Sequence, residues 1–402
     1  MSRTPTSDDH DVLVDLVCVG GIARAAYVLV KRTYAIVERA CVRARVEPLL
    51  HDLRDPTLRP RLPIGSDFWA HKAATDVVVR GSAFAPDGKP TRSLVATARV
   101  GRAVKRVAVF GRRLVEWQVG HVRFAEPEPF VSMPLTRDHA YGGVDPRVVP
   151  ERLSTALAVG ADHPGVYPRN PFGKGYLVHA DPVAGAELPN LEDPADLLTP
   201  ERLVVGDPRR WFEQPLPWCF DEAHPMSFPR CTCLPGVDAW FPAPRDARLA
   251  EIRRGLVPGG HPLSPGARRP EAWFAQEGSY GLVLDDLEPG APVVLQAMHP
   301  ERAQIAFSLP VAPAIEVLTD ARLERAMPRM HSVVLRPADL SVDVVWGAHV
   351  RLPRGFIPGV HARIPVAAIV DGGAPLAYRA PPVRARDVQE PPPSGADPRS
   401  PT

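Results

Sequence analysis

Four residues of types that bind metals lie close together in the middle of the sequence: Cys219, His224, Cys231 and Cys233. Zinc takes four nitrogen or sulfur ligands in a tetrahedron, and its sites commonly pair ligands two to four residues apart. The spacing here, C-x4-H-x6-C-x-C, is irregular, although an extended backbone would place Cys231 and Cys233 on one face. Free cysteines are commonly small buried residues. We therefore favour a core role and keep the four residues as candidate metal ligands.

Paired carboxylates are the second chemical possibility. Glycoside hydrolysis needs two carboxyl groups facing each other across a cleft, and residues 187–193 together with Asp285 and Asp286 could supply them. Acidic residues in proline-rich loops more often bind nearby backbone groups or solvent. We therefore expect no catalysis from them.

A phosphate-binding loop is the third possibility, suggested by Gly173-Lys174-Gly175. A P-loop needs a hydroxyl residue for magnesium and a preceding strand, and here proline-rich sequence comes before the glycines. We expect a structural turn packed by Tyr167 and Tyr176. The sequence also contains none of the motifs of serine hydrolases, zinc proteases or dinucleotide-binding enzymes. We predict no cofactor and no enzymatic activity.

The elements that position these residues are mostly β-strands. Runs rich in β-branched and aromatic residues predict strands, and a hairpin should turn at Gly101-Arg102. The expected strands and hairpin cover residues 27–37, 75–84, 93–111, 130–135, 292–296, 304–309, 331–335, 340–350 and 364–370. Residues 138–245 lack this periodicity, so we expect an ordered, irregular layer over the sheets there, with a helix at 245–254.

Proline supports the same fold class, since 49 of the 402 residues are prolines and proline interrupts both helices and central strands. We predict a mostly β protein with β-sandwich-like N- and C-terminal portions, an irregular proline-rich middle layer and few short helices. The expected divisions are a flexible N-terminus (1–10), a β-rich portion (11–145), a loop-rich middle (146–277), a second β-rich portion (278–379) and a disordered tail (380–402). Whether the two β-rich portions share one sandwich or form two is left open by the pattern.

Charge and cysteine content limit the possible partners and compartment. Lysine and arginine total 48 against 46 acidic residues, a net charge of +2, which predicts no nucleic-acid partner because such binders concentrate basic residues. The N-terminal apolar stretch is interrupted by charged residues, and no run of 18 apolar residues suggests a membrane span. With five cysteines and no export signal, we expect reduced thiols and a cytoplasmic location.

A series of linear motifs is more specific than any catalytic signature. Four of the five lysines fall inside it, with Lys105 as the exception. The series comprises residues 30–34 (VKRTY), 66–81 (SDFWAHKAATDVVVRG), 85–90 (APDGKP), 133–136 (MPLT), 140–143 (AYGG), 167–175 (YPRNPFGKG) and 188–194 (LPNLEDP). Its order and spacing resemble the domain-of-unknown-function family 2169, which is found beside type VI secretion genes in bacteria. The resemblance is dense over residues 28–194 and looser beyond, where residues 344–347 (VVWG) look like the family's late tryptophan strand; residues 218–240 depart from its pattern.

This resemblance implies a non-enzymatic adaptor or chaperone that binds a secreted effector, a PAAR-like tip or a spike protein for loading on the secretion spike. It transfers no catalytic residues. The motif residues are candidates for folding or for partner binding, and for Asp76 and Arg80 we expect a same-face ion pair or hydrogen-bonded pair. These residues are Lys72, Asp76, Arg80, Tyr141, Gly142, Tyr167, Arg169, Asn170, Gly173, Lys174, Asn190, Glu192 and Asp193.

Two alternatives stay open beside the adaptor. One is an enzyme, either a metallohydrolase using the Cys/His group or a carbohydrate-active protein using the loop carboxylates. The other is that the chain is itself a secreted cargo or spike-associated component.

Overall fold

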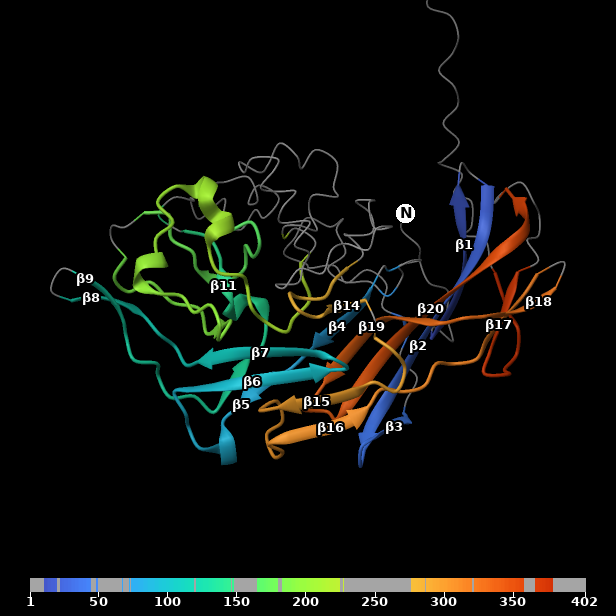
Figure 1. Ribbon diagram of the computed structural model, residues 1–402, viewed down its shortest axis with the longest axis horizontal. Coiled ribbons are helices and arrows are strands. Elements are labelled where there is room, and N and C mark those ends of the chain that lie inside the picture. The colour runs from blue at the N-terminus through green and yellow to red at the C-terminus, as the bar shows by residue number, and fades with distance from the viewer. Residues whose placement is uncertain are drawn as a thin grey trace, which may run out of the picture.

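Two β-sheets packed against each other form the body of the protein (Figure 1). The computed structural model describes residues 11–19, 22–44, 48–49, 67, 72, 74–118, 121–145, 147, 165–179, 183–224, 227, 276–285, 287–319, 322–357 and 366–378. Within these residues strands predominate, and helices are limited to four short 3-10 segments. They are η1 (Pro86–Gly88), η2 (Arg137–His139), η3 (Pro200–Arg202) and η4 (Pro208–Glu213). The predicted mostly β fold is confirmed, and no helix in this part of the chain is long and apolar enough to cross a membrane.

The large sheet joins strands from both ends of the sequence. Its order is β1-β2-β20-β19-β4-β14, with β3 also paired to β2, and only β19 and β4 run parallel. Its strands are β1 (Val12–Val19), β2 (Ile22–Val37), β3 (Ala40–Arg43), β4 (Thr75–Val79), β14 (Val283–Leu284), β19 (Arg329–Arg336) and β20 (Ser341–Phe356). Because β2 and β20 pair along most of their length, the N- and C-terminal β-rich portions share one sandwich.

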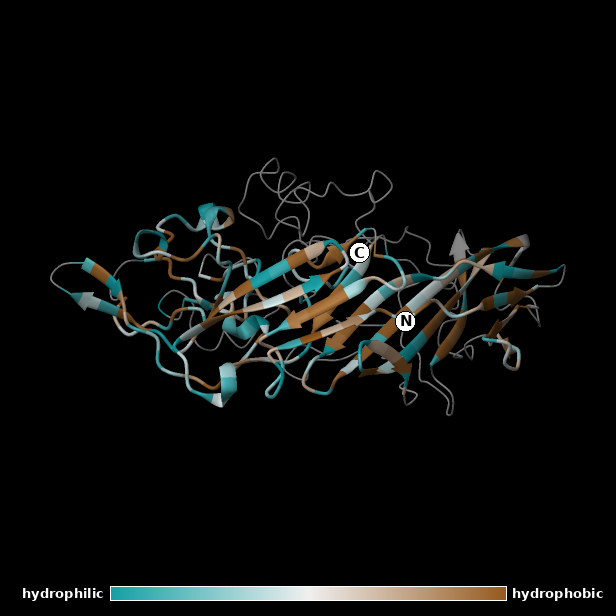
Figure 2. Ribbon diagram, turned by 60° about the horizontal axis from the view of Figure 1, so that its bottom comes forward, coloured by the Kyte–Doolittle hydropathy of each residue, from teal (hydrophilic) through white to brown (hydrophobic). Residues whose placement is uncertain are grey.

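The five-stranded sheet packs on the large sheet and has the order β13-β7-β6-β15-β16. It contains β6 (Ser93–Val100), β7 (Ala103–Phe110), β13 (Leu191–Glu192), β15 (Pro292–Gln296) and β16 (Gln304–Ser308). Its strands alternate between buried apolar and exposed residues, which Figure 2 shows as alternating colours along the ribbons. The hairpin at Gly101, where φ is 58°, is confirmed.

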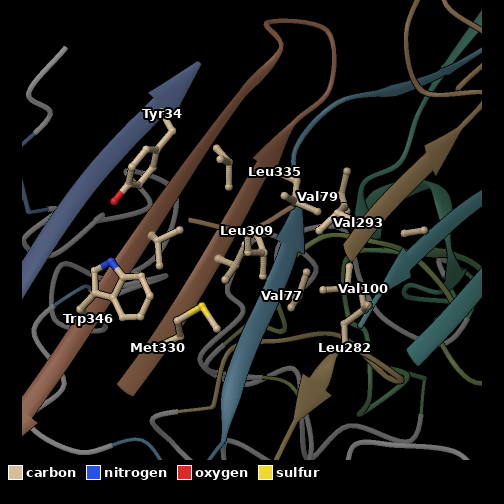
Figure 3. Close-up of a cluster of buried hydrophobic side chains, with 14 of the residues drawn as sticks. Tyr34, Val77, Val79, Val100, Leu282, Val293, Leu309, Met330, Leu335 and Trp346 are labelled. Atoms are coloured by element: carbon tan, nitrogen blue, oxygen red, sulfur yellow. The ribbon is translucent and has the colours of Figure 1, made fainter. Parts of the chain in front are cut away.

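One continuous core fills the space between these two sheets. Leu335 and Trp346 of the large sheet and Val100 and Val293 of the five-stranded sheet are at most 1% exposed and belong to the same cluster (Figure 3). Burial of apolar surface is the main stabilising contribution to such a sandwich. Shared burial therefore makes the two sheets one folding unit.

Smaller sheets extend the body at both ends (Figure 1). A four-stranded sheet contains β17 (Ile315–Leu318), β18 (Leu323–Ala326), β21 (Ala367–Val370) and β22 (Leu376–Ala377), and its inner residues join the main core. Three strand pairs lie elsewhere: β5 (Ser82–Phe84) with β10 (Ser132–Pro134), β8 (Val115–Gln118) with β9 (His121–Phe124), and β11 (Tyr141–Gly142) with β12 (Lys174–Gly175). The sequence pattern missed several strands, among them β1, β8, β9, β17 and β18. The last four are each only four residues long, and β1 is apolar except at Asp15, so neither kind of run shows an extended alternation.

The irregular layer, as far as residues 137–224 are described, has a core of its own. Tyr141, Tyr167, Tyr176 and Trp211 are at most 2% exposed and lie in one cluster, apart from the main core. The layer lies beside one end of the five-stranded sheet (Figure 1), to which β13 attaches it by pairing with β7. The expected helix at 245–254, the flexible N-terminus at 1–10 and the disordered tail at 380–402 lie outside the described residues.

Candidate functional site

A small cavity, with several charged and polar residues among those that line it, lies where the irregular layer meets the sandwich. Its volume is about 30 Å³, enough for about two water molecules. It combines residues from four separate parts of the chain. The lining residues are Arg137, Arg169, Asn170, Pro217, Cys219, Asp221, Glu222, Ala223, His224, Ser227, Gly278, Ser279 and Tyr280.

Backbone hydrogen bonds fix the segment that carries Cys219, Asp221 and Glu222. The Val79 amide of β4 donates to the Phe220 carbonyl at 3.1 Å, and the Phe220 amide donates to the Leu135 carbonyl at 3.2 Å. The Ala223 amide then donates to the Glu277 carbonyl at 2.7 Å. The segment thus runs beside β4 and brings its two adjacent carboxyl groups to the cavity.

The two carboxyl groups have opposite pKa shifts. Burial and the neighbouring Asp221 raise the pKa of Glu222, whose Oε1 accepts a hydrogen bond from Arg80 at 3.1 Å. Burial opposes the ionisation of Asp221, but Arg137, 3.1 Å away, outweighs it and lowers the pKa of Asp221. The two adjacent carboxyl groups therefore differ in acidity, with Asp221 the stronger acid beside Arg137 and Glu222 the weaker acid beside Arg80.

Cys219 and His224, half of the candidate metal group, both reach the cavity. Burial raises the pKa of the Cys219 thiol to about 11, which keeps it protonated and a poor ligand or nucleophile near neutral pH. His224 packs edge-on against Phe172, with 4.5 Å between ring centres. No group of three potential ligands with metal-site geometry occurs in the described part of the chain, and Cys231 and Cys233 lie outside it.

Lys105 lies behind Ser279 on the buried face of β7. Its ammonium donates to Ser279 Oγ at 3.0 Å and to the Tyr280 carbonyl at 2.6 Å, and it lies 4.4 Å from the centre of the Trp218 ring. Burial lowers the pKa of Lys105 to about 7. Lys105 therefore ties the cavity wall to the five-stranded sheet.

Arg169 and Asn170, of the 167–175 motif, form part of the cavity wall. Arg169 donates to the carbonyls of Phe212 at 2.9 Å and Gln214 at 3.1 Å, and Asn170 Nδ2 donates to the carbonyls of Arg137 and Tyr141. Both side chains thus replace the backbone partners that this irregular segment lacks. Their contacts are structural.

Lys72 and Asp76 form a buried pair that ties β4 to two other segments. Lys72 Nζ lies 2.7 Å from Asp76 Oδ2 and also donates to Ser332 of β19. Asp76 in turn accepts from Gln276 Nε2 and the Glu277 amide. The expected pairing of Asp76 with Arg80 is wrong, because Asp76 bonds Lys72 while Arg80 bonds Glu222.

The 190–193 motif is built around buried hydrogen bonds. Asn190 Nδ2 donates to the carbonyls of Phe110 and Gly111, and Glu192 accepts from Arg113 and from the Leu198 amide. Asp193 accepts from the Ala195 amide at 2.9 Å, which closes a local turn.

Close packing explains why Gly142 and Gly173 are glycines and why Tyr141 and Tyr167 are tyrosines. A Cβ on Gly142 would lie 2.2 Å from the Asn170 carbonyl oxygen, and one on Gly173 would lie 2.4 Å from the Ala140 oxygen. The Tyr141 and Tyr167 rings pack edge to face, with centres 5.1 Å apart. The predicted turn at 173–175 is wrong in place: Lys174 and Gly175 form the short strand β12, which pairs in parallel with β11, and the turn lies at Pro171 and Phe172. Tyr167 and Tyr176 both belong to the buried cluster of the layer.

Two of the loop carboxylates proposed for glycosidase chemistry, Glu187 and Glu192, form ion pairs. Glu187 is exposed and bonds Arg112 at 2.9 Å and Lys174 at 3.4 Å, and the Arg112 hydrogen bond lowers the pKa of Glu187. Of the second pair, Asp286 lies outside the described residues.

Sequence reasoning missed Arg137, Asp221, Glu222 and Ser279. None stands in a recognised motif, and their closeness depends on long-range pairing of the 218–224 and 276–284 segments with β4. The one available signal is the acidic pair Asp221-Glu222 directly after Trp218-Cys219-Phe220, where adjacent charges follow a buried apolar run.

A family model covers this whole arrangement, from residue 22 to residue 347. The chain belongs to the DUF2169 family. That family is described as uncharacterized protein conserved in bacteria. The match includes the late strand around Trp346, where the motif resemblance is looser. No curated protein and no solved structure matches the chain.

Proposed function

We propose that this DUF2169 protein is a non-enzymatic adaptor or chaperone of type VI secretion. In this role it binds a secreted effector, a PAAR-like tip or a spike protein in the cytoplasm before loading on the spike. The motif series and its resemblance to a family found beside type VI secretion genes motivate the choice of partner.

The observation that supports the proposal most directly is that the polar groups of the motif side chains bind other groups of the same chain. Lys72, Asp76, Arg169, Asn170 and Glu192 are buried and bind groups of the same chain. A substrate-binding site would instead direct such groups into a cleft. The motifs therefore preserve a rigid scaffold, which suits a protein that presents its surface to a partner.

Affinity purification of the tagged protein from its own host, followed by mass spectrometry, tests this proposal. Recovery of an effector, a PAAR-like protein or a spike protein in stoichiometric amount is the expected result. A monomer without companions under secreting conditions would overturn it. Detection of the protein in the culture medium would favour the alternative in which the chain is itself secreted.

One arrangement favours an enzyme as the second candidate. Ser279 Oγ lies 3.0 Å from Lys105 Nζ, and lysines of lowered pKa activate serine nucleophiles in some hydrolases. However, Ser279 donates its proton to the Cys219 carbonyl at 2.9 Å, and both side chains are buried. Turnover in a hydrolase screen that disappears in Ser279→Ala would support this candidate over the adaptor.

A further inference from the structure

The outward face of the five-stranded sheet carries cations without acidic partners. Strands β6, β7, β15 and β16 contain no aspartate or glutamate. Arg99 on β6, Arg102 in the β6–β7 turn and Arg106 on β7 are all exposed. None of the three forms an ion pair within the described part of the chain, unlike Arg112 and Arg123 nearby.

Strand register places the arginines together on this face. Arg106 stands opposite Thr97, and Arg99, two residues further along β6, stands opposite Val104. Arg99 and Arg106 are therefore diagonal neighbours, about 7–8 Å apart at the backbone. Like charges at this separation repel each other, and an acidic ligand would relieve that repulsion.

Exposed aliphatic residues lie beside the charges, Val104 opposite Arg99 and Val95 two residues before Thr97, the partner of Arg106. Val95 and Val104 are 48% and 47% exposed, and both face outward because their neighbours Ala96 and Lys105 are buried. Gln296 and Gln304 continue the face across β15 and β16, joined by a 3.0 Å hydrogen bond. The strands run side by side at the front of Figure 1 and form a broad sheet surface.

We propose that this face, centred on Arg99, Arg106, Val95 and Val104, is the docking surface for an acidic, aliphatic segment of a protein partner. The proposal rests on the adaptor function and names the chemistry of its partner. Guanidinium groups bind carboxylates in bidentate pairs, and the valines provide apolar contact beside them.

A protein segment fits this face better than nucleic acid does. Nucleic-acid binders engage many phosphates through a wide basic field or stack bases on aromatic rings. Here the side chains between Arg99 and Arg106 are valine and threonine, and the whole chain carries a net charge of only +2.

The test uses the full chain and a fluorescent peptide of alternating glutamate and valine. We expect saturable binding that weakens when salt is raised, and a loss of affinity of about tenfold or more in Arg99→Glu/Arg106→Glu. Arg329→Glu is the matched control, because Arg329 is also exposed and starts a strand of the other sheet. Arg329→Glu should bind the peptide like the wild type. The thermal unfolding curve of the double variant should match that of the wild type, which shows that the loss of affinity is not a loss of folding.

Other outcomes overturn the proposal. Equal binding of the double variant and the wild type, no peptide binding, or equal binding of the glutamine-for-glutamate peptide would each do so. Tighter binding of duplex DNA or of phosphatidylserine vesicles than of the peptide would assign the face to phosphate instead. If the host partner co-purifies and binds the double variant normally, this surface is wrong while the adaptor function stands; if no partner exists, the function fails whatever the peptide does.

Discussion

In the sandwich, backbone groups pair with backbone groups and the buried side chains are mostly apolar, whereas in the irregular layer buried polar side chains bind the backbone. β2 and β20 pair from Ala23 to Ala35 in a regular backbone ladder, to which Thr33 adds one side-chain hydrogen bond to Asp343. In the layer, Asn170 and Asn190 each bind two carbonyls, and Asp145 accepts from the Val178 amide. Irregular backbone is therefore stable in a protein interior only where specific side chains form hydrogen bonds with its N–H and C=O groups.

This difference predicts how each region responds to substitution. A periodic apolar core tolerates exchanges that keep the volume constant, while a side chain that satisfies buried backbone groups has no substitute of similar shape. Conservative substitutions of buried side chains should therefore lower the stability more in the layer than in the sandwich.

The largest effect is expected at Arg113, which is 8% exposed and binds the Pro189 carbonyl and the Glu192 carboxylate. Arg113→Ala leaves Glu192 buried without its cation, so the free energy of unfolding should fall by about 3–5 kcal/mol. Chemical denaturation measures this loss. Burial already raises the pKa of Glu192, so the loss should be smaller at pH 5 than at pH 8, because Glu192 can then be protonated. Arg113→Lys keeps the charge without the planar fork and should be intermediate; a loss below about 1 kcal/mol would contradict this account.

The next effect concerns the sandwich, at the fully buried Leu335 of β19. Leu335→Ala should lower the free energy of unfolding by about 2–5 kcal/mol through lost burial and the cavity left behind. Leu335→Met should cost less than about 1.5 kcal/mol, since it conserves volume. Denaturation midpoints of the two variants give the comparison. If both substitutions were equally damaging, the sandwich would not tolerate exchanges that keep the volume constant.

The sequence predicted the sandwich well and the layer poorly for the same physical reason. In β6, Ala96, Ala98 and Val100 alternate with exposed residues, and this local pattern is enough to identify both strand and face. In the layer, Asn170 and Asn190 act on carbonyls tens of residues away, so no local period reveals them.

The candidate site was partly predictable. Arg169 and Asn170 stand in a recognisable motif, and Cys219 and His224 were singled out as candidate ligands; all four line the cavity. Arg137, Asp221 and Glu222 reach it only through tertiary pairing. The predicted pairing of Asp76 with Arg80 is wrong because Asp76 bonds Lys72 and Arg80 bonds Glu222, both on other segments of the chain.

A smaller effect should distinguish Lys105, a buried charged residue of the five-stranded sheet. Burial holds its pKa at about 7 in the folded protein, well below the value of about 10.4 expected in the unfolded chain. Above pH 7 the unfolded state binds more protons, so stability should rise with pH across this window and be lost as pH falls toward 7. Relative to Lys105→Met, the wild type should gain about 1–2 kcal/mol between pH 7 and about pH 8.5. Denaturation at the two pH values measures the gain; a difference that does not change with pH would show that Lys105 keeps its ordinary pKa.

The smallest effect is expected next to the largest, at Arg112. Its side chain is 52% exposed, and it bonds Glu187 at 2.9 Å and Glu128 at 3.3 Å, both of which are also exposed. Solvent and salt screen such pairs, so they contribute little to stability. Arg112→Ala should leave the denaturation midpoint unchanged within error, at low and at high salt. This is expected although Arg112 forms two ion pairs and Arg113 forms two hydrogen bonds. A loss comparable to that of Arg113→Ala would mean that charge rather than burial determines the stability lost on substitution here, because the two adjacent arginines each bond a glutamate and differ in exposure.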